Sequence, residues 1–260
     1  RVGDTVSPSS SAEPRPMIRV VEETGSTNAD LAALGLAAAE GEWLVARRQR
    51  AGRGRAGRTW SDGAGNFMGS TAAHLRAGDP TAHTLALVAG LAAAQATADV
   101  AALGGMLALK WPNDLLLGGA KLGGILLERQ GDTIVVGIGV NLAAAPDVPG
   151  RATTSLAIHG LVVPVERFAE VLHARWSQAL AGWHRGEWPR LRREWLALAH
   201  PHGTRLGVKA ADDTQLVGTF AGLAEDGAAH LRLADGTVHV IHAGDVELVG
   251  GEQVSHAAGG

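Results

Sequence analysis

The chain contains no cysteine, which excludes disulfide bonds, thiolate metal sites and a cysteine nucleophile. Its eleven histidines lack the spacing of a metal site such as His-x3-His, so we expect them to be structural or exposed. The residues therefore identify no metal ligand. An absence of cysteine is also consistent with the reducing cytoplasm, which is the location we expect.

Neither a membrane span nor a secretory signal is indicated. Residues 84–100 are mostly alanine and contain Gln95 and Asp99, which favours a buried helix over a membrane span. Residues 1–16 are rich in proline and serine instead of the apolar core of a signal peptide, so we expect a flexible tail. A net charge of -3 argues against a general nucleic-acid binder, and we expect neither DNA nor a membrane as a partner.

The 260 residues, 46% of them hydrophobic, are enough for one large core and a small second domain. We assign the larger domain to residues 17–200. Strands are expected at 17–23, 43–46, 66–73, 107–111, 115–117, 124–129 and 133–141, and helices around 31–36, at 81–103, at 165–183 and around 191–198. The strands after residue 103 follow one another closely, which requires antiparallel neighbours. Trp176 and Trp183 fall on one apolar stripe of a helix and are interpreted as core.

A change of pattern after Pro201 marks the second domain. Residues 201–249 alternate short strands with Asp-Gly turns, which predicts a small β-barrel of about 50 residues that leans on a larger neighbour. Residues 250–260 are expected to form a flexible tail.

The most informative segment is the run from Gln49 to Trp60, in which four arginines alternate with glycines. Glycine permits close backbone approach, and guanidinium groups hold phosphate or carboxylate oxygens in a bidentate fork. The run therefore predicts an anion-binding loop. A phosphate-binding P-loop is a weak match, because Arg58 stands where lysine is required and no helical pattern follows. An RNA-binding Arg/Gly segment and a solvated turn remain as alternatives.

A second motif runs from Lys110 to Asp114 and is followed by Lys121. Pro112 and Asn113 form a tight turn between strands. Asp114 and Lys121 either bring an acid and an ammonium group into one cleft or form a surface pair of little consequence, and the residues alone give the two possibilities equal weight.

Two glycines precede Asn141 in a third motif, at positions 137 and 139. Their spacing resembles a dinucleotide fingerprint only superficially, because a third glycine and a following helix are missing. We expect these glycines to lie in a central strand, where their lack of a side chain lets a ligand come close to the backbone. Asn141 then either contacts an adenine edge or caps the strand.

Together with Ser26-Thr27-Asn28 and Lys121-Leu122-Gly123-Gly124-Ile125, these motifs resemble biotin-protein ligases in order and spacing, from about Val20 to Val249. The resemblance implies an α+β fold, with a mixed, largely antiparallel sheet flanked by helices and a small C-terminal SH3-like β-barrel. It also implies a two-step reaction. Biotin and Mg-ATP give biotinyl-5′-AMP and pyrophosphate, and the acyl group then passes to a lysine of a biotin carboxyl carrier domain of acetyl-CoA carboxylase or a related carboxylase. No tightly bound prosthetic group is implied.

The resemblance also suggests roles for individual residues. Catalytic roles fall to Lys121, Arg53, Arg55 and Asp114, with Asp114 orienting or deprotonating the acceptor lysine. Biotin-binding roles fall to Ser26, Thr27, Asn28, Gln49, Gly52, Arg53, Lys121 and Gly124. Adenylate-binding roles fall to Arg55, Trp60, Asn113 and Asn141. About 25 residues precede Ser26, too few for a DNA-binding helix-turn-helix, so a monofunctional ligase is expected.

Two other functions stay open at this stage. Lipoate-protein ligase shares the adenylate chemistry and the lysine target, although the arginine-rich loop favours biotin. A noncatalytic protein that grips an acidic partner or RNA is the alternative from another class. The sequence does not indicate the oligomeric state, the carriers that are modified, the effect of Ala56 or whether the loop is ordered without ligand.

Overall fold

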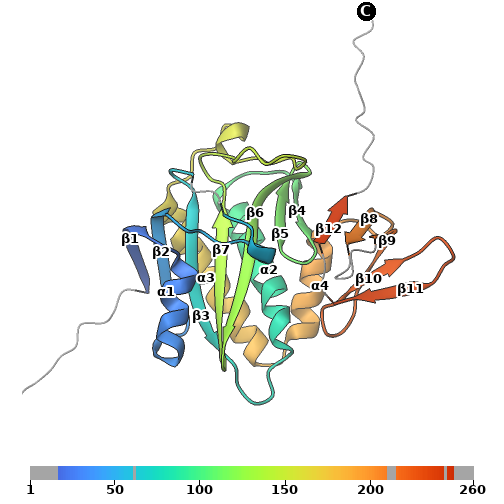
Figure 1. Ribbon diagram of the computed structural model, residues 1–260, viewed down its shortest axis with the longest axis horizontal. Coiled ribbons are helices and arrows are strands. Elements are labelled where there is room, and N and C mark those ends of the chain that lie inside the picture. The colour runs from blue at the N-terminus through green and yellow to red at the C-terminus, as the bar shows by residue number, and fades with distance from the viewer. Residues whose placement is uncertain (1–16, 61–62, 210–214, 243–244, 249–260) are drawn as a thin grey trace, which may run out of the picture.

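The computed structural model describes residues 17–60, 63–209, 215–242 and 245–248. The larger part contains a seven-stranded sheet of order β1-β2-β3-β7-β6-β5-β4 (Figure 1). Its strands are β1 (Ile18–Thr24), β2 (Trp43–Gln49), β3 (Phe67–His74), β4 (Leu107–Lys110), β5 (Asp114–Leu117), β6 (Ala120–Gln130) and β7 (Thr133–Val140). Only β1 and β2 are parallel, because helix α1 (Thr27–Leu34) connects them. The predicted mixed, largely antiparallel sheet is confirmed.

Helices cover both faces of this sheet. In Figure 1, α1 and the Gln49 to Trp60 run lie on the near face, while α2 (Leu85–Val100), α3 (Val165–His184) and α4 (Trp188–Leu198) lie on the far face. Buried alanines of α2, such as Ala92 and Ala96, let this helix pack closely against its neighbours. No helix in the described part of the chain is both long and apolar enough to cross a membrane.

Some element boundaries differ from those expected. The helix predicted at 81–103 begins at Leu85, after a single turn at Ala82–Thr84 in which the Thr84 hydroxyl donates to the carbonyl of Thr81. It ends at Val100, and Gly104 and Gly105 then take positive φ angles of 53° and 84°, which ends the helical path. Strand β6 is longer than the predicted 124–129, because the glycines before Ile125 continue the strand rather than break it.

Aromatic side chains fill the core between the sheet and the far-face helices. Phe168 of α3 meets Phe67 of β3 edge to face, with ring centroids 5.1 Å apart. Trp176 and Trp183 are completely buried, which confirms that they are core residues. The indole N–H of Trp183 donates to the Thr84 hydroxyl at 2.8 Å, so its polar atom is satisfied inside the core.

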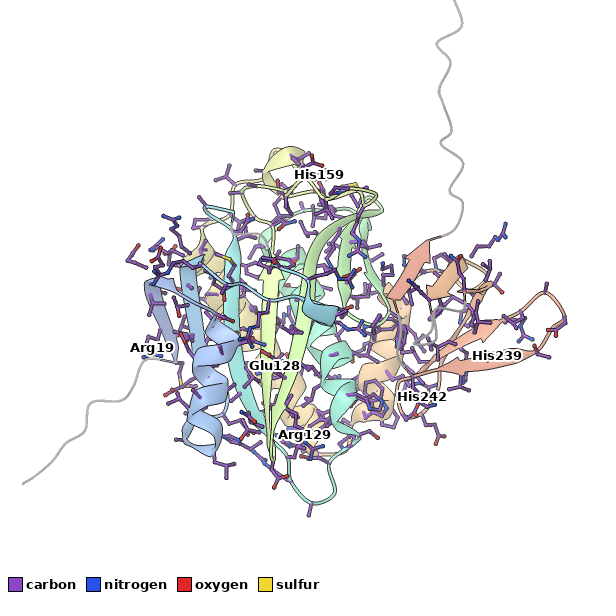
Figure 2. The ribbon with its side chains drawn as sticks, in the orientation of Figure 1. Arg19, Glu128, Arg129, His159, His239 and His242 are labelled. Carbon is purple, nitrogen blue, oxygen red and sulfur yellow. The ribbon has the colours of Figure 1, made fainter. Side chains whose placement is uncertain are left out.

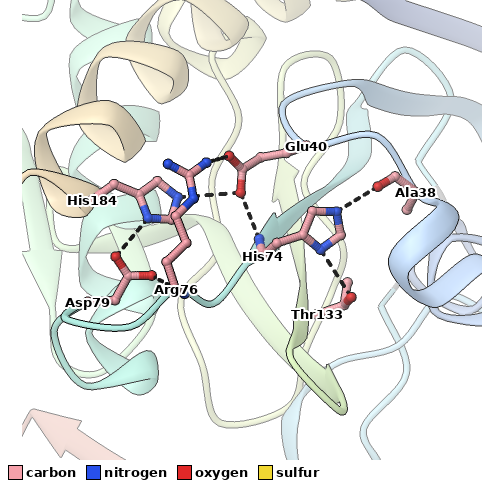
Figure 3. A network of polar contacts seen from close by, with 7 residues as sticks. All are labelled: Ala38, Glu40, His74, Arg76, Asp79, Thr133 and His184. Atoms are coloured by element: carbon pink, nitrogen blue, oxygen red, sulfur yellow. Dashed lines mark hydrogen bonds and ion pairs between the residues drawn. The ribbon is translucent and has the colours of Figure 1, made fainter.

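A polar network closes one end of this domain (Figure 3). His74, the last residue of β3, contacts the Thr133 hydroxyl at the start of β7 at 3.1 Å, and its backbone N–H donates to Glu40 at 2.7 Å. At the end of α3, His184 contacts Asp79 at 2.8 Å. The network therefore ties sheet, helix and connecting loop together.

A second sheet follows α4 and has the order β11-β10-β9-β8-β12. Its strands, β8 (Arg205–Lys209), β9 (Gln215–Leu223), β10 (Ala229–Arg232), β11 (Val238–Ile241) and β12 (Asp245–Leu248), are all paired antiparallel. A small C-terminal β domain is confirmed. Among the described residues β11 and β12 do not pair, so the sheet is open where a closed barrel was expected. The expected tails at 1–16 and 250–260 lie outside the described residues.

We expect Phe168→Ala to lower the free energy of unfolding by about 3–5 kcal/mol, because it empties a completely buried site. Urea unfolding followed by circular dichroism measures the change. Val162→Ala is the matched control, since Val162 is 91% exposed and its truncation should change stability by less than about 0.5 kcal/mol. Equal losses in the two variants would contradict the assignment of Phe168 to the core.

Candidate active site

A cavity opens on the near face of the seven-stranded sheet, on the same side as α1. It contains about 1200 Å³ of space, including its open mouth. Gly137 and Gly139, alternate residues of β7, form part of its floor with the neighbouring Gly124 of β6. They do not form a dinucleotide fingerprint, because both lie inside a strand rather than at a turn before a helix.

One end of the cavity is built from uncharged hydrogen-bonding groups at the start of α1. Ser26 caps this helix, as its position before Thr27 predicts, and its hydroxyl accepts from the N–H of Ala29. The side-chain oxygen of Gln49 accepts from the backbone N–H of Thr27 at 2.8 Å and from its hydroxyl at 3.2 Å. The Thr27 hydroxyl also lies 2.6 Å from that of Ser70 on β3. We call this group the polar end.

Asn28 and Glu128 link the polar end to the arginine loop. The Asn28 amide donates to Glu128 at 2.8 Å, and the Ser70 hydroxyl donates to the Asn28 carbonyl oxygen at 2.5 Å. The other oxygen of Glu128 accepts from Arg53 at 3.2 Å. Figure 2 shows Glu128 near the middle of the sheet. A Cβ atom at Gly137 would lie 2.2 Å from the Asn28 side chain, so glycine is required there for Asn28 to sit against the strand.

The Gln49 to Trp60 run folds back on itself as a narrow loop. The N–H of Trp60 donates to the carbonyl of Gly52 at 2.9 Å, and the N–H of Gly54 donates to that of Arg58 at 2.6 Å. At its tip Ala56 has φ 54° and ψ 38°, a left-handed conformation that costs about 1–2 kcal/mol for a residue with a Cβ atom. The loop packs within the folded domain and bonds to Glu128 and Asn113, which argues against an RNA-binding tail.

Trp60 anchors this loop on the glycine floor. A Cβ atom on Gly139 would lie 2.3 Å from the indole ring, and one on Gly124 would lie 3.4 Å from it. The two glycines are paired across β6 and β7 and give the ring a flat place to lie. Close approach to the strand was expected at Gly137 and Gly139, and the groups that make it are the side chains of Asn28 and Trp60, while the expected approach of a ligand stays a prediction.

The opposite end of the cavity, which we call the cationic end, surrounds one buried carboxylate. Asp114 begins β5, and its side chain is 7% exposed. One oxygen accepts a hydrogen bond from Lys121, whose side chain is 18% exposed. The other oxygen lies 3.0 Å from Lys110 and 3.9 Å from Arg151. The acid and the ammonium group therefore share one cleft, and the surface-pair interpretation is wrong.

The pKa values of this pair are set by burial and by the close charges. Burial raises the pKa of the Asp114 carboxyl, but Lys121 and then Lys110 lower it, and the net shift is downward from 3.8. Burial is also the largest effect on Lys121 and lowers the pKa of its ammonium group below 10.5, while Asp114 opposes this shift. Arg151 and Lys110 add to the lowering.

Two asparagines complete the wall. Asn113 donates to the carbonyl of Ile125 at 2.8 Å and accepts from Arg55 at 3.2 Å, which joins the loop to the turn before β5. Asn141 is buried and donates to the carbonyl of Thr154 at 3.0 Å. It lines the cavity and also holds the following loop in place.

The residues singled out in the sequence lie close to this cavity, which brings together Ser26, Thr27, Asn28, Gln49, Arg53, Arg55, Trp60, Asn113, Asp114, Lys121, Gly124 and Asn141. Gly52 holds the loop through the backbone of Trp60. Sequence reasoning missed Ser70, Glu128 and Arg151 and treated Lys110 only as part of a turn motif. Alternation along β3 and β6 would have placed Ser70 and Glu128 on one face, but no local pattern marks Arg151.

Two chemically different ends thus face one cavity. The polar end suits a neutral ligand with amide-like groups, and the cationic end suits an anion that gains charge during a reaction. Among the described residues no group of histidine, aspartate and glutamate side chains is arranged to hold a metal ion. Asp114, the carboxylate of the cationic end, is already surrounded by cations.

The chain is similar to known proteins over most of its length. Residues 19–142 match the model of the biotin/lipoate A/B protein ligase family, and residues 207–249 match that of the biotin protein ligase C-terminal domain. A biotin--[acetyl-CoA-carboxylase] ligase of Paracoccus denitrificans is 38% identical over 82% of this chain and 93% of its own length. One of Mycobacterium tuberculosis is 35% identical over 87% of each.

Solved structures agree with this. A biotin protein ligase of Leishmania major in complex with biotin is 27% identical, with a TM-score of 0.62, over 88% of this chain and all of that one. The biotin protein ligase of Aquifex aeolicus in complex with biotin and ATP has a TM-score of 0.79 at 24% identity, covering 89% and 99% of the two chains, and so shares the fold.

We expect Asp114→Asn to destabilise the folded protein by about 3–5 kcal/mol at pH 7, because Lys110 and Lys121 lose their buried counter-charge. The folded-state pKa of Asp114 is depressed, so its stabilising effect is present above about 3.8 and is lost as the pH falls through the folded value. The difference in the free energy of unfolding between wild type and Asp114→Asn should therefore become smaller below that pH. Urea unfolding of both proteins between pH 7 and pH 3 measures this difference.

Asp99→Asn serves as the control, because Asp99 pairs with Arg175 at a partly exposed site where both side chains are 37% exposed. Its loss should cost less than about 1 kcal/mol. A gap for Asp114→Asn that is equally large at pH 7 and pH 3 would contradict the proposed ionisation.

Proposed function

The chain belongs to the biotin/lipoate A/B protein ligase family, and we propose that it uses ATP to join biotin to a lysine of a biotin carboxyl carrier domain through biotinyl-5′-AMP. The observation that carries this proposal is the buried contact of Asp114 with Lys121 in the same cavity as the polar end. The names of the two bacterial relatives support acetyl-CoA carboxylase as the source of the carrier domain.

Biotin fits the two ends of the cavity in one direction. Its cyclic urea offers N–H donors and a carbonyl acceptor, which match Ser26, Thr27, Asn28 and Gln49 at the polar end. Its carboxylate then points along the glycine floor toward Lys121. Gly124 lies between Trp60 and Lys121, where a side chain would fill the path.

Adenylate formation brings two anions together. A carboxylate oxygen of biotin attacks the α-phosphorus of ATP, the bond to pyrophosphate breaks, and negative charge grows on the phosphoryl oxygens. Lys121, Arg53 and Arg55 line the cavity where they can spread this charge. Mg²⁺ enters with the phosphates of ATP as part of the substrate, which is consistent with its usual coordination.

The nucleotide half of the intermediate lies toward the loop and the end of β7. Trp60 presents an aromatic ring and an indole N–H that has no hydrogen-bond partner among the described residues. Asn113 and Asn141 line the same cavity, and we assign Asn141 to adenine. Arg55, already bound to Asn113, closes over the phosphate.

Transfer to the carrier is an acyl substitution. The amine of the acceptor lysine attacks the acyl carbon, the bond to AMP breaks, and an amide forms with loss of a proton. A free lysine is protonated at neutral pH, so a carboxylate both attracts it and accepts its proton. Asp114 is placed for this role once Lys121 turns toward the anionic intermediate.

The polar end also favours biotin over lipoate. The dithiolane ring of lipoate has no strong hydrogen-bonding group, so Thr27 and Gln49 would lose water without gaining partners. We expect intact-mass measurement of a biotin carrier domain, incubated with the enzyme, ATP and Mg²⁺, to show the mass gain of one biotin. Lipoate in place of biotin should give none. No gain with biotin would reject the proposed function.

We expect the two half-reactions to separate by mutation. Lys121→Ala should slow adenylate formation by about 10²–10³-fold, because a cation that stabilises the transition state is lost. Asp114→Ala should mainly slow transfer from preformed biotinyl-5′-AMP, by about 10²–10⁴-fold.

Biotin-dependent exchange of pyrophosphate into ATP measures the first step, and transfer to the carrier measures the second. Asp99→Ala is a surface control for both. Equal losses in both steps for both site variants would reject this division of roles.

A further inference from the structure

Lys110 joins the cationic end to the C-terminal sheet. It is the last residue of β4 and is 8% exposed, with its ammonium group between two oxygens. One belongs to Asp114, 3.0 Å away, and the other is the carbonyl of Val246 on β12, 2.8 Å away. A single buried cation thus connects the proposed base to the other domain.

The C-terminal sheet is held against the first domain by further bonds of the same kind. Trp111, next in the chain, donates its indole N–H to the carbonyl of Gly227 at 3.0 Å. Trp188 of α4 donates to the carbonyl of Glu225 at 2.5 Å, and His83 contacts the carbonyl of Asp226 at 2.6 Å. Because these bonds locate the sheet independently of Lys110, the Val246 carbonyl is a fixed point for its ammonium group.

The two oxygens of Asp114 have different surroundings. Both lysines line the cavity, but the ammonium group of Lys121 is held only by Oδ1 in the described part of the chain, so the anion formed in the first step competes with Asp114 for its charge. Lys110 contacts Oδ2 and also donates to the Val246 carbonyl, so this second bond holds its ammonium group beside Asp114 when the anion forms. Release of Lys121 therefore uncovers one oxygen while the other remains held.

We propose that Lys110 is a positioning residue that fixes Oδ2 of Asp114 to the C-terminal sheet, so that Oδ1 faces the acceptor amine when Lys121 turns to the acyl phosphate. The inference rests on the proposed function and adds a role for the contact between the domains. It also gives the adjacent residues Lys110 and Trp111 a shared purpose that a turn motif alone would not require.

The test compares Lys110→Met, which keeps an unbranched side chain one atom shorter and removes its charge, with Lys110→Arg, which keeps the charge. Pyrophosphate exchange and transfer from preformed biotinyl-5′-AMP are measured on the full chain from pH 3 to pH 9, so that the range includes the acid limb of Asp114. We expect Lys110→Met to slow transfer by roughly 10–100-fold and exchange by less than about threefold, because the main change is to the orientation and basicity of Asp114, while Lys110 is the smallest influence on the pKa of Lys121. Lys110→Arg should restore most of the transfer rate.

The pH profile separates positioning from simple structural support. The charged groups that face Asp114 are Lys110, Lys121 and Arg151. His200 lies near Lys110, and burial and then the positive charge of Lys110 lower the pKa of this histidine. Removing Lys110 takes away one charge that lowers the pKa of Asp114, so the acid limb of transfer should move to higher pH in Lys110→Met and stay in place in Lys110→Arg. Trp111→Phe, which loses the bond to Gly227 and keeps every charge, should leave this limb unmoved.

Three results would overturn the inference. The first is a transfer rate in Lys110→Met equal to that of the wild type. The second is an equal loss of exchange and transfer rates in Lys110→Met without a shift of the acid limb, and the third is a shift of the acid limb in Trp111→Phe as large as that in Lys110→Met. Circular dichroism checks folding, and Lys110→Gln replaces Lys110→Met if the latter does not fold. A wild-type enzyme without biotin-dependent exchange would reject the proposed function and this inference with it, whereas an active wild type with unaffected Lys110 variants rejects only the inference.

Discussion

The buried carboxylate of Asp114 is the constraint on which the rest of the site depends. A carboxylate that is 7% exposed is costly unless it is paired, and here three cations from three segments of the chain converge on it. Lys110 ends β4, Lys121 lies at the start of β6, and Arg151 comes from the loop after β7. Two strands of the sheet and one loop outside it therefore each bring one charged group to the same carboxylate.

The neighbouring half of the site is shaped by the absence of side chains. Gly124 and Gly139 face each other across β6 and β7, and the ring of Trp60 lies where a Cβ atom on Gly139 would be and in contact distance of one on Gly124. Because the ring can approach the sheet this closely, the arginine loop crosses the cavity within reach of both Glu128 and Asn113. Charge alone would not hold the loop there, since the Arg53 and Glu128 side chains are 55% and 30% exposed and such pairs contribute little.

The sequence predicted well those features of the fold that depend on residues close together in the chain. The antiparallel β4 to β7 meander and the buried Trp176 both follow from neighbouring residues. The site was found through the resemblance of several motifs together, because no single one was specific. Contacts such as Asn28 with Glu128, 100 residues apart, are fixed by sheet order, which single-sequence patterns do not contain. The Lys110 contact with Val246 crosses 136 residues and was missed for the same reason.

The bonds that dock the C-terminal sheet share one further property. In the contacts of Lys110, Trp111 and Trp188 the first domain supplies the side chain and the second supplies a backbone carbonyl. Every residue type has that carbonyl, so the bonds themselves place no demand on the side chains at Val246 and Glu225. Gly227 is an exception, because its φ is 89° and a Cβ atom there would lie 3.1 Å from Leu87. In these bonds the demand for a particular side chain therefore falls on the first domain. Side chains that make specific bonds form recognisable sequence motifs, such as the one from Lys110 to Asp114. Backbone acceptors leave no such motif, and the second domain was predicted from its strands and turns alone.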